Sequence, residues 1–99
     1  MSEAEDPPLE IPLTGELDLH AFSPRDIPSV VEEYVAACAA KGLTVLRLAH
    51  GRGKGVQRAV VRGALAGMPL VEAFEDAAGL SGGWGATVVH LRPKEKHVP

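Results

Sequence analysis

The first pattern in this chain is a strict alternation of polar and apolar residues over residues 16–20. Two leucines share one face of that segment, while Glu16, Asp18 and His20 share the other. This period is typical of a half-buried β-strand, because successive side chains of a strand point to opposite faces. We therefore expect a strand over residues 16–20, with Asp18 and His20 as neighbours near its C-terminal end.

Two later segments carry apolar residues at helical spacing instead. The first begins between Ser23 and Asp26, either of which is a suitable N-cap, and ends before Gly42. Its apolar residues form one stripe with the spacing of a helix: Ile27, Val30, Val31, Tyr34, Val35 and Cys38. A second helix is predicted from Val56 to about Ala66. Both segments indicate helices that pack one face against a core.

Three further apolar runs complete the predicted fold. Residues 43–49 indicate a mostly buried strand, residues 70–75 a short strand and residues 86–91 a final strand. The first two strands are joined through a helix, so we expect them to pair in parallel. The order βαβαββ predicts an α/β two-layer sandwich, in which a four-stranded mixed sheet lies under two helices.

A glycine-rich loop follows the second predicted strand directly. It consists of His50, Gly51, Arg52, Gly53, Lys54 and Gly55. Its alternate glycines allow the backbone to approach an anion closely, and a helix begins just after it. A strand, a glycine loop and a helix N-terminus in this order are typical of phosphate binding. Because ligands bind beyond the carboxyl ends of parallel strands, we expect this loop to meet Asp18 and His20 at one edge of the sheet.

Two residues in the loops of this region have two interpretations each. His50 either caps the loop by bonding a backbone carbonyl or takes part in phosphate binding or catalysis. Trp84, in a glycine-rich segment before the last predicted strand, either stacks on a nucleic-acid base or covers the core. The residue pattern leaves both alternatives open.

Charged residues are divided unevenly along the chain. Residues 1–33 hold nine acidic residues and one basic residue, whereas residues 34–99 hold nine basic and four acidic residues, for a total net charge of −3. Arg58 and Arg62 lie four residues apart on the second predicted helix, where a shared anionic partner would offset the repulsion between them. The division indicates either an acidic tail beside a surface that faces a polyanion or simply a solvated basic face.

Composition and length exclude several classes of protein. No apolar run reaches the roughly 18–20 residues of a membrane span, and the acidic, proline-containing N-terminus is unlike a secretory signal. The single cysteine cannot form an internal disulfide, which favours a reducing compartment. We expect a cytoplasmic monomer with no membrane partner. One domain is expected over residues 15–92, between an N-terminal arm (1–14) and a polar tail (93–99).

Four segments together resemble the Smr (small MutS-related) domain family in their order and spacing. They are Leu17-Asp18-Leu19-His20, the glycine loop with Arg58 beyond it, Pro69-x-Val71-x-x-Phe74, and the run from Gly82 to Val89. The resemblance implies a fold like that of the C-terminal domain of translation initiation factor three. It also implies nucleic-acid binding and, in many members, endonuclease activity on DNA or on RNA, including messenger RNA on stalled ribosomes.

Residue by residue, the resemblance implies that Asp18 and His20 take part in cleavage, and the family's histidine and glycine loop corresponds to His50, Gly51, Gly53 and Gly55. From the residues themselves we expect the glycine loop, with Arg52 and Lys54, to hold the phosphate. Two departures are Ala21, where the family usually has glycine, and Lys54, where threonine is common. We expect His20 to act as general base or acid, oriented by Asp18. With RNA the 2′-hydroxyl would be the nucleophile and no metal is needed. With DNA water must attack, and Asp18 could help to hold Mg²⁺ or Mn²⁺.

Two functions of different classes follow from these residues. The first is an endonuclease of low sequence specificity, and the second is a module that binds nucleic acid or a ribosome without cutting it. The candidate catalytic residues are Asp18, His20 and His50. The candidate phosphate or nucleic-acid contacts are Gly51, Arg52, Gly53, Lys54, Gly55, Arg58, Arg62 and Trp84.

Overall fold

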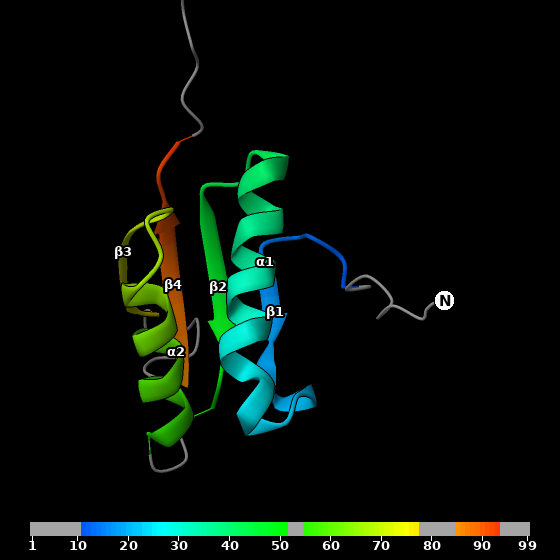
Figure 1. The fold of residues 1–99 in the computed structure, drawn as a ribbon, viewed down its shortest axis with the longest axis vertical. Helices are drawn as coiled ribbons and strands as arrows, with labels where there is room; N and C mark the ends of the chain where they lie inside the picture. The colour runs from blue at the N-terminus through cyan, green and yellow to red at the C-terminus, as the bar shows by residue number, and fades with distance from the viewer. Residues whose placement is uncertain (1–10, 52–54, 78–84, 94–99) are drawn as a thin grey trace, which may run out of the picture.

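Four strands form one mixed sheet, and two long helices cover one of its faces (Figure 1). The computed structural model describes residues 11–51, 55–77 and 85–93. The elements are β1 (Glu16–Asp18), η1 (Leu19–Ala21), η2 (Pro24–Asp26), α1 (Ile27–Lys41), β2 (Val45–Ala49), α2 (Val56–Ala66), β3 (Val71–Asp76) and β4 (Ala86–Leu91), where η marks a 3₁₀ turn. No helix among these residues has the length and apolar character needed to cross a membrane.

The strands lie side by side in the order β1-β2-β4-β3. β1 pairs in parallel with β2, and β4 is antiparallel to both of its neighbours. Strands β1, β2 and β3 therefore run in the same direction, and their carboxyl ends share one edge of the sheet. The predicted βαβαββ order and the two-layer α/β architecture are confirmed.

The first strand is shorter than the alternation predicts. It ends at Asp18, so the prediction of a strand over residues 16–20 was wrong for its last two residues. The Asp18 carboxylate accepts a hydrogen bond from the backbone N–H of His20 at 2.9 Å, which turns the chain into η1. Such a bond competes with the ladder of a sheet for the same N–H group. Leu17 and Leu19 are both buried, as the alternation predicts.

The two candidate N-caps of the first helix stand before different elements, and neither side chain makes a capping hydrogen bond. Ser23 precedes the turn η2, and Asp26 precedes α1 itself. The predicted apolar stripe of α1 is buried along its whole length. Gly42 ends the helix with φ at +100°, a conformation that favours glycine. α2 spans the residues that the sequence predicts.

The remaining strands differ from the predictions only at their ends. β2 begins two residues later than the apolar run over residues 43–49, and β3 is shifted by one residue from residues 70–75. β4 matches its predicted range. Thr87 of β4 is a polar residue that is fully buried among apolar core residues.

A buried tyrosine ties the first strand to the first helix. The hydroxyl of Tyr34 accepts a hydrogen bond from the backbone N–H of Gly15 at 3.1 Å and donates one to the carbonyl of Glu16 at 3.1 Å. Burial raises the pKa of Tyr34, so the hydroxyl keeps its proton and remains a donor. These bonds hold the start of β1 against α1 and thereby position the two polar residues that follow.

Candidate functional site

The segments that the sequence singles out meet at the carboxyl edge of the sheet. β1 and β2 are parallel and in register, with Asp18 opposite Ala49. The turn that contains His20 follows β1 at this edge, and His50 and Gly51 follow β2 at the same edge (Figure 1). The parallel register of β1 and β2 places these two segments next to each other.

Asp18 and His20 form an exposed, hydrogen-bonded pair. Oδ1 of Asp18 lies 2.7 Å from Nδ1 of His20 and 2.9 Å from its backbone N. A carboxylate oxygen accepts, so Nδ1 carries the proton and Nε2 presents a lone pair in the neutral ring. The side chains are 62% and 72% exposed for His20 and Asp18, respectively. The backbone N–H of His20, followed by its imidazole, holds the pKa of Asp18 below its ordinary value of 3.8.

The His20 ring lies directly against Gly51 of the loop. A β-carbon built at Gly51 would come within 2.6 Å of Nε2 of His20, closer than two such atoms can approach. Gly51 also has φ at +80°, where other residues are strained. The predicted meeting of the first strand's histidine with the glycine loop is therefore confirmed for Gly51.

His50 lies beneath the same edge rather than on it. It is only 3% exposed, and both of its ring nitrogens have partners. Nδ1 donates to the carbonyl of Gly51 at 3.0 Å, and Nε2 lies 2.8 Å from Oγ1 of Thr87 on β4. Burial lowers the pKa of His50 below its ordinary value of 6.5, so the ring is neutral. Of the alternatives left open by the sequence, the bond to a backbone carbonyl is the one observed.

Arg58 and Arg62 share an anionic partner from their own chain. Arg58 forms bonds of 2.9–3.0 Å to Asp76 at the end of β3, and Arg62 reaches the same carboxylate at 2.7 Å. The guanidinium of Arg62 also lies 5.2 Å from the centre of the Phe74 ring. The two arginines, Arg58 first, lower the pKa of Asp76. Asp76 is thus the shared anionic partner that offsets the repulsion between the two arginines. A nucleic-acid contact of either arginine stays a prediction.

The rest of the predicted loop is only partly within the described residues. Gly55 precedes α2 and accepts a bond from the N–H of Ala59 at 3.0 Å in the first turn. Arg52, Gly53, Lys54 and Trp84 lie outside the described residues. Their predicted phosphate and base contacts therefore stay predictions.

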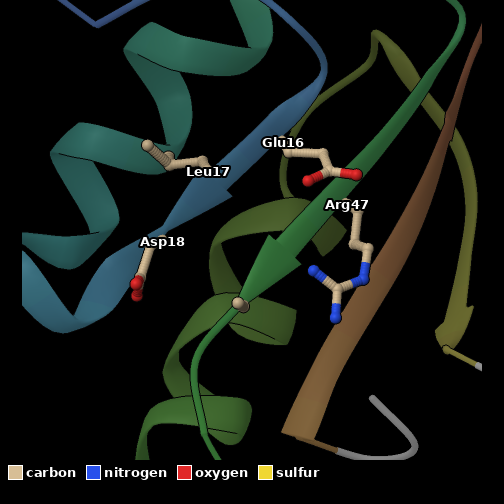
Figure 2. Close-up of a pocket in the computed structure, with 5 residues that line it drawn as sticks. Glu16, Leu17, Asp18 and Arg47 are labelled. Carbon is tan, nitrogen blue, oxygen red and sulfur yellow. The ribbon is translucent and has the colours of Figure 1, made fainter. Parts of the chain in front are cut away.

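A shallow hollow lies beside the Asp18–His20 pair, on the face of the sheet away from the helices. It has a volume of about 300 Å³ and is lined by Glu16, Leu17, Asp18, Arg47 and Ala49. Figure 2 shows Glu16 and Arg47 side by side on this face, where they are partners in the register, while Leu17 points toward α1. In residues 11–51, 55–77 and 85–93 no three His, Cys, Asp or Glu side chains are grouped so as to hold a metal ion.

Comparison with known proteins gives the family. The sequence model of the Smr domain matches residues 17–92. This chain belongs to the Smr domain family. Endonuclease MutS2 of Thermus thermophilus is 41% identical over 78 residues, which are 79% of this chain and 10% of that protein. Endonuclease MutS2 of Finegoldia magna is 30% identical over 80 residues, 81% of this chain and 10% of that protein. The chain therefore spans about a tenth of the length of these relatives.

Solved Smr structures share the fold. The crystal structure of the Smr domain of Thermus thermophilus MutS2 aligns with a TM-score of 0.76 at 40% identity, over 81% of this chain and 100% of that one. YdaL, a stand-alone small MutS-related protein from Escherichia coli, aligns with a TM-score of 0.69 at 26% identity, over 82% of this chain and 66% of that one. The fold prediction is thus confirmed by structure as well as by sequence.

One departure from the Smr pattern is accommodated without strain. Ala21, where the family usually has glycine, is exposed at the end of η1. Among the described residues no residue other than glycine has a positive φ, so Ala21 adopts ordinary backbone angles. The adjacent Asp18–His20 hydrogen bond forms in its presence.

Two residues that matter for this edge were missed by sequence reasoning. Thr87 bonds His50, and Asp76 pairs with two arginines. A polar residue within an apolar strand was the available signal for Thr87, and an acid directly after a strand was the signal for Asp76. Neither signal identifies a partner, because both partners lie far away along the chain.

Proposed function

We propose that this Smr protein is an endonuclease of low sequence specificity that cleaves phosphodiester bonds in RNA or structured DNA. Asp18 and His20 are the proposed catalytic residues. The observation that carries the proposal is their exposed pair at 2.7 Å, with Nε2, the ring nitrogen that Asp18 does not contact, facing Gly51 of the glycine loop. The relationship to Endonuclease MutS2 of Thermus thermophilus supports the reaction class.

In this mechanism His20 moves a proton and Asp18 orients the ring. Nε2 of His20 accepts the proton of the nucleophile, which is the 2′-hydroxyl in RNA or water in DNA, as that oxygen attacks phosphorus. The bond from phosphorus to the leaving oxygen breaks, and the leaving oxygen takes a proton from solvent water, while the imidazolium of His20 returns its proton to solvent. The carboxylate of Asp18 holds Nδ1 and stabilises the imidazolium that forms, as in other carboxylate–histidine pairs.

The phosphate is held by the other side of the site in this proposal. The N-terminus of α2, which follows Gly55, provides backbone N–H groups, and Arg52, Gly53 and Lys54 complete the loop. The N–H of Gly51 is already bonded to the carbonyl of Gly85, so Gly51 places the start of the loop. Further contacts to nucleic acid are proposed for Arg58, Arg62 and Trp84. His50 is assigned to holding the loop instead of catalysis, because its ring is buried and both nitrogens are engaged.

A panel of substrates tests the proposal. Single-stranded RNA, supercoiled plasmid and branched DNA are incubated with the protein in Mg²⁺, in Mn²⁺ and in EDTA, and products are resolved on gels. An Asp18→Ala variant purified in parallel controls for contaminating nucleases. We expect products with the wild type and not with the variant.

The same panel distinguishes cleavage from binding alone. Binding that weakens steeply with salt, without any product, would overturn the nuclease assignment and leave a nucleic-acid-binding module. In that case cosedimentation with ribosomes would decide whether its partner is ribosomal. Equal products from the wild type and from Asp18→Ala would contradict the proposed centre.

A further inference from the structure

We propose that Thr87 and His50 are positioning residues. They hold Gly51 in place, and the His20 imidazole packs against Gly51 in the space that a side chain there would occupy. This inference rests on the proposed function, since it concerns how the proposed general base is placed. It assigns to His50 a role beneath the site and gives Thr87 a role that the sequence did not suggest.

The hydrogen bonds around His50 have defined directions. A carbonyl oxygen can only accept, so Nδ1 of His50 carries the proton in its 3.0 Å bond to Gly51. The ring is neutral because burial lowers its pKa, so Nε2 has a lone pair and accepts the hydroxyl proton of Thr87 at 2.8 Å. Thr87 itself is fully buried on β4. The Gly51 carbonyl is thereby linked through two hydrogen bonds to the middle of the sheet.

The backbone N–H groups that precede that carbonyl are hydrogen-bonded as well. The N–H groups of His50 and Gly51 both donate to the carbonyl of Gly85, at 3.0 Å and 2.7 Å, just before β4 begins. Gly51 is therefore held at its N–H by the main chain and at its carbonyl by the His50 ring. Its φ of +80° is maintained by partners on both sides.

Gly51, held in this way, is in contact with the His20 ring. The space where a β-carbon would stand at Gly51 is taken by Nε2 and Cε1 of His20, at 2.6 Å and 3.3 Å. Asp18 restrains the other side of the same ring through Nδ1. The ring is thus placed between a carboxylate and a bare backbone, and a movement of Gly51 would move the reacting nitrogen. Displacements of about 1 Å at a catalytic group lower rates by up to about a hundredfold.

Substitutions of Thr87 test the hydrogen-bonded link. Thr87→Val has nearly the same shape and removes the donor, whereas Thr87→Ser keeps the hydroxyl. We expect Thr87→Val to lower kcat by about tenfold with KM changed less than about twofold. Thr87→Ser should keep most of the wild-type kcat. By NMR, Thr87→Val should also shift the His20 ring ¹⁵N signals and weaken the contact between His20 Hε1 and Gly51 Hα.

Two glycine variants provide a matched pair. Gly42 and Gly51 both have positive φ, but a β-carbon at Gly42 meets nothing within 4 Å. Gly42→Ala measures backbone strain alone, and we expect it to lower Tm by about 5 °C without moving the His20 signals. Gly51→Ala should lower Tm by about 10 °C or more and displace the His20 ring. The additional loss of Tm in Gly51→Ala, relative to Gly42→Ala, should disappear when His20→Ala is also present, because the clash with the His20 ring is then absent.

The NMR measurements separate this inference from the proposed function, because they need no cleavage. A folded Thr87→Val protein with unchanged His20 signals and unchanged kcat would overturn the positioning role. If Thr87→Val does not fold, the glycine pair decides: equal Tm losses and equal His20 spectra for Gly42→Ala and Gly51→Ala would overturn it. Displaced His20 signals in a protein that cuts no substrate would support the positioning role and count against the nuclease function.

Discussion

Two histidines stand at the same edge of the sheet and have opposite environments. The His20 side chain is 62% exposed and its Nδ1 faces a carboxylate, whereas His50 is 3% exposed and its Nδ1 faces a carbonyl. A carboxylate stabilises a ring that gains a proton, while burial beside a neutral carbonyl disfavours one. The comparison teaches that exposure and hydrogen-bond partner, not residue type, distinguish the histidine proposed for proton transfer from the histidine that holds the loop.

The largest expected effect is on the exposed member of this pair. His20→Ala should lower the cleavage rate by about 10²–10⁴-fold, the range typical of a lost general acid or base. Its Tm should stay within about 2 °C of the wild type, because the side chain buries little surface. Rates are measured on the best substrate of the panel and Tm by calorimetry.

His90 provides the matched control for that experiment. It is also a partly exposed histidine paired with a carboxylate, with Nε2 3.2 Å from Oε2 of Glu75. His90→Ala should keep the wild-type rate. If both variants lose activity equally, the special role of His20 is refuted.

The second prediction concerns the buried member and the pH dependence of stability. Above about pH 6.5 His50 is neutral in both the folded and the unfolded chain, so its ionisation contributes nothing. Below that pH His50 becomes protonated in the unfolded chain but stays neutral in the folded protein, because burial lowers its pKa there. The free energy of unfolding should therefore fall on acidification, by at most about 1.4 kcal/mol per pH unit from this group.

Urea denaturation between about pH 7.5 and about pH 5.5 measures this slope. His50→Gln should reduce the slope, and His20→Ala should retain the part due to His50. Asp18 and Asp76 do not confuse the result, since their pKa values lie below the ordinary 3.8. If the His50 ring signals of the wild type titrate near pH 6.5 by NMR, the ring is not protected and the contrast with His20 fails.

The smallest expected effect concerns charge near the edge. Asp76 engages both Arg58 and Arg62, so Asp76→Asn should make their charge more available to a phosphate backbone. We expect nucleic-acid affinity to rise by about fivefold, or about 1 kcal/mol, with a steeper dependence on salt. Fluorescence anisotropy with labelled RNA and DNA at several salt concentrations measures both quantities.

Glu75→Gln is the control for Asp76→Asn. It changes the net charge by the same amount at the neighbouring position, where the carboxylate pairs with His90 instead of the arginines. An equal gain in affinity for both variants would mean that only net charge matters. A gain confined to Asp76→Asn would identify the two arginines as part of the binding surface.

Local patterns predicted much of this fold and part of this site. The stripe on α1 and the glycine at its end identified that helix, and the alternation at Leu17 and Leu19 identified what β1 buries. The parallel pairing of β1 and β2 brought Asp18, His20 and Gly51 together as predicted. The predicted end of β1 was wrong because the backbone N–H of His20 bonds to the Asp18 side chain instead of continuing the strand. Periodicity alone does not reveal such a bond.

The sequence by itself determined the elements, their order and the meeting of two segments at one edge. The reason is that the spacing of apolar residues and the connection between consecutive elements are local properties of the chain. Only the tertiary structure decided which histidine is exposed and which is buried. The bond between His50 and Thr87 joins residues 37 positions apart, and Asp76 reaches arginines 14 and 18 positions away. Burial and hydrogen-bond partners at such separations are set by how the layers pack, and they determine the chemistry of each side chain.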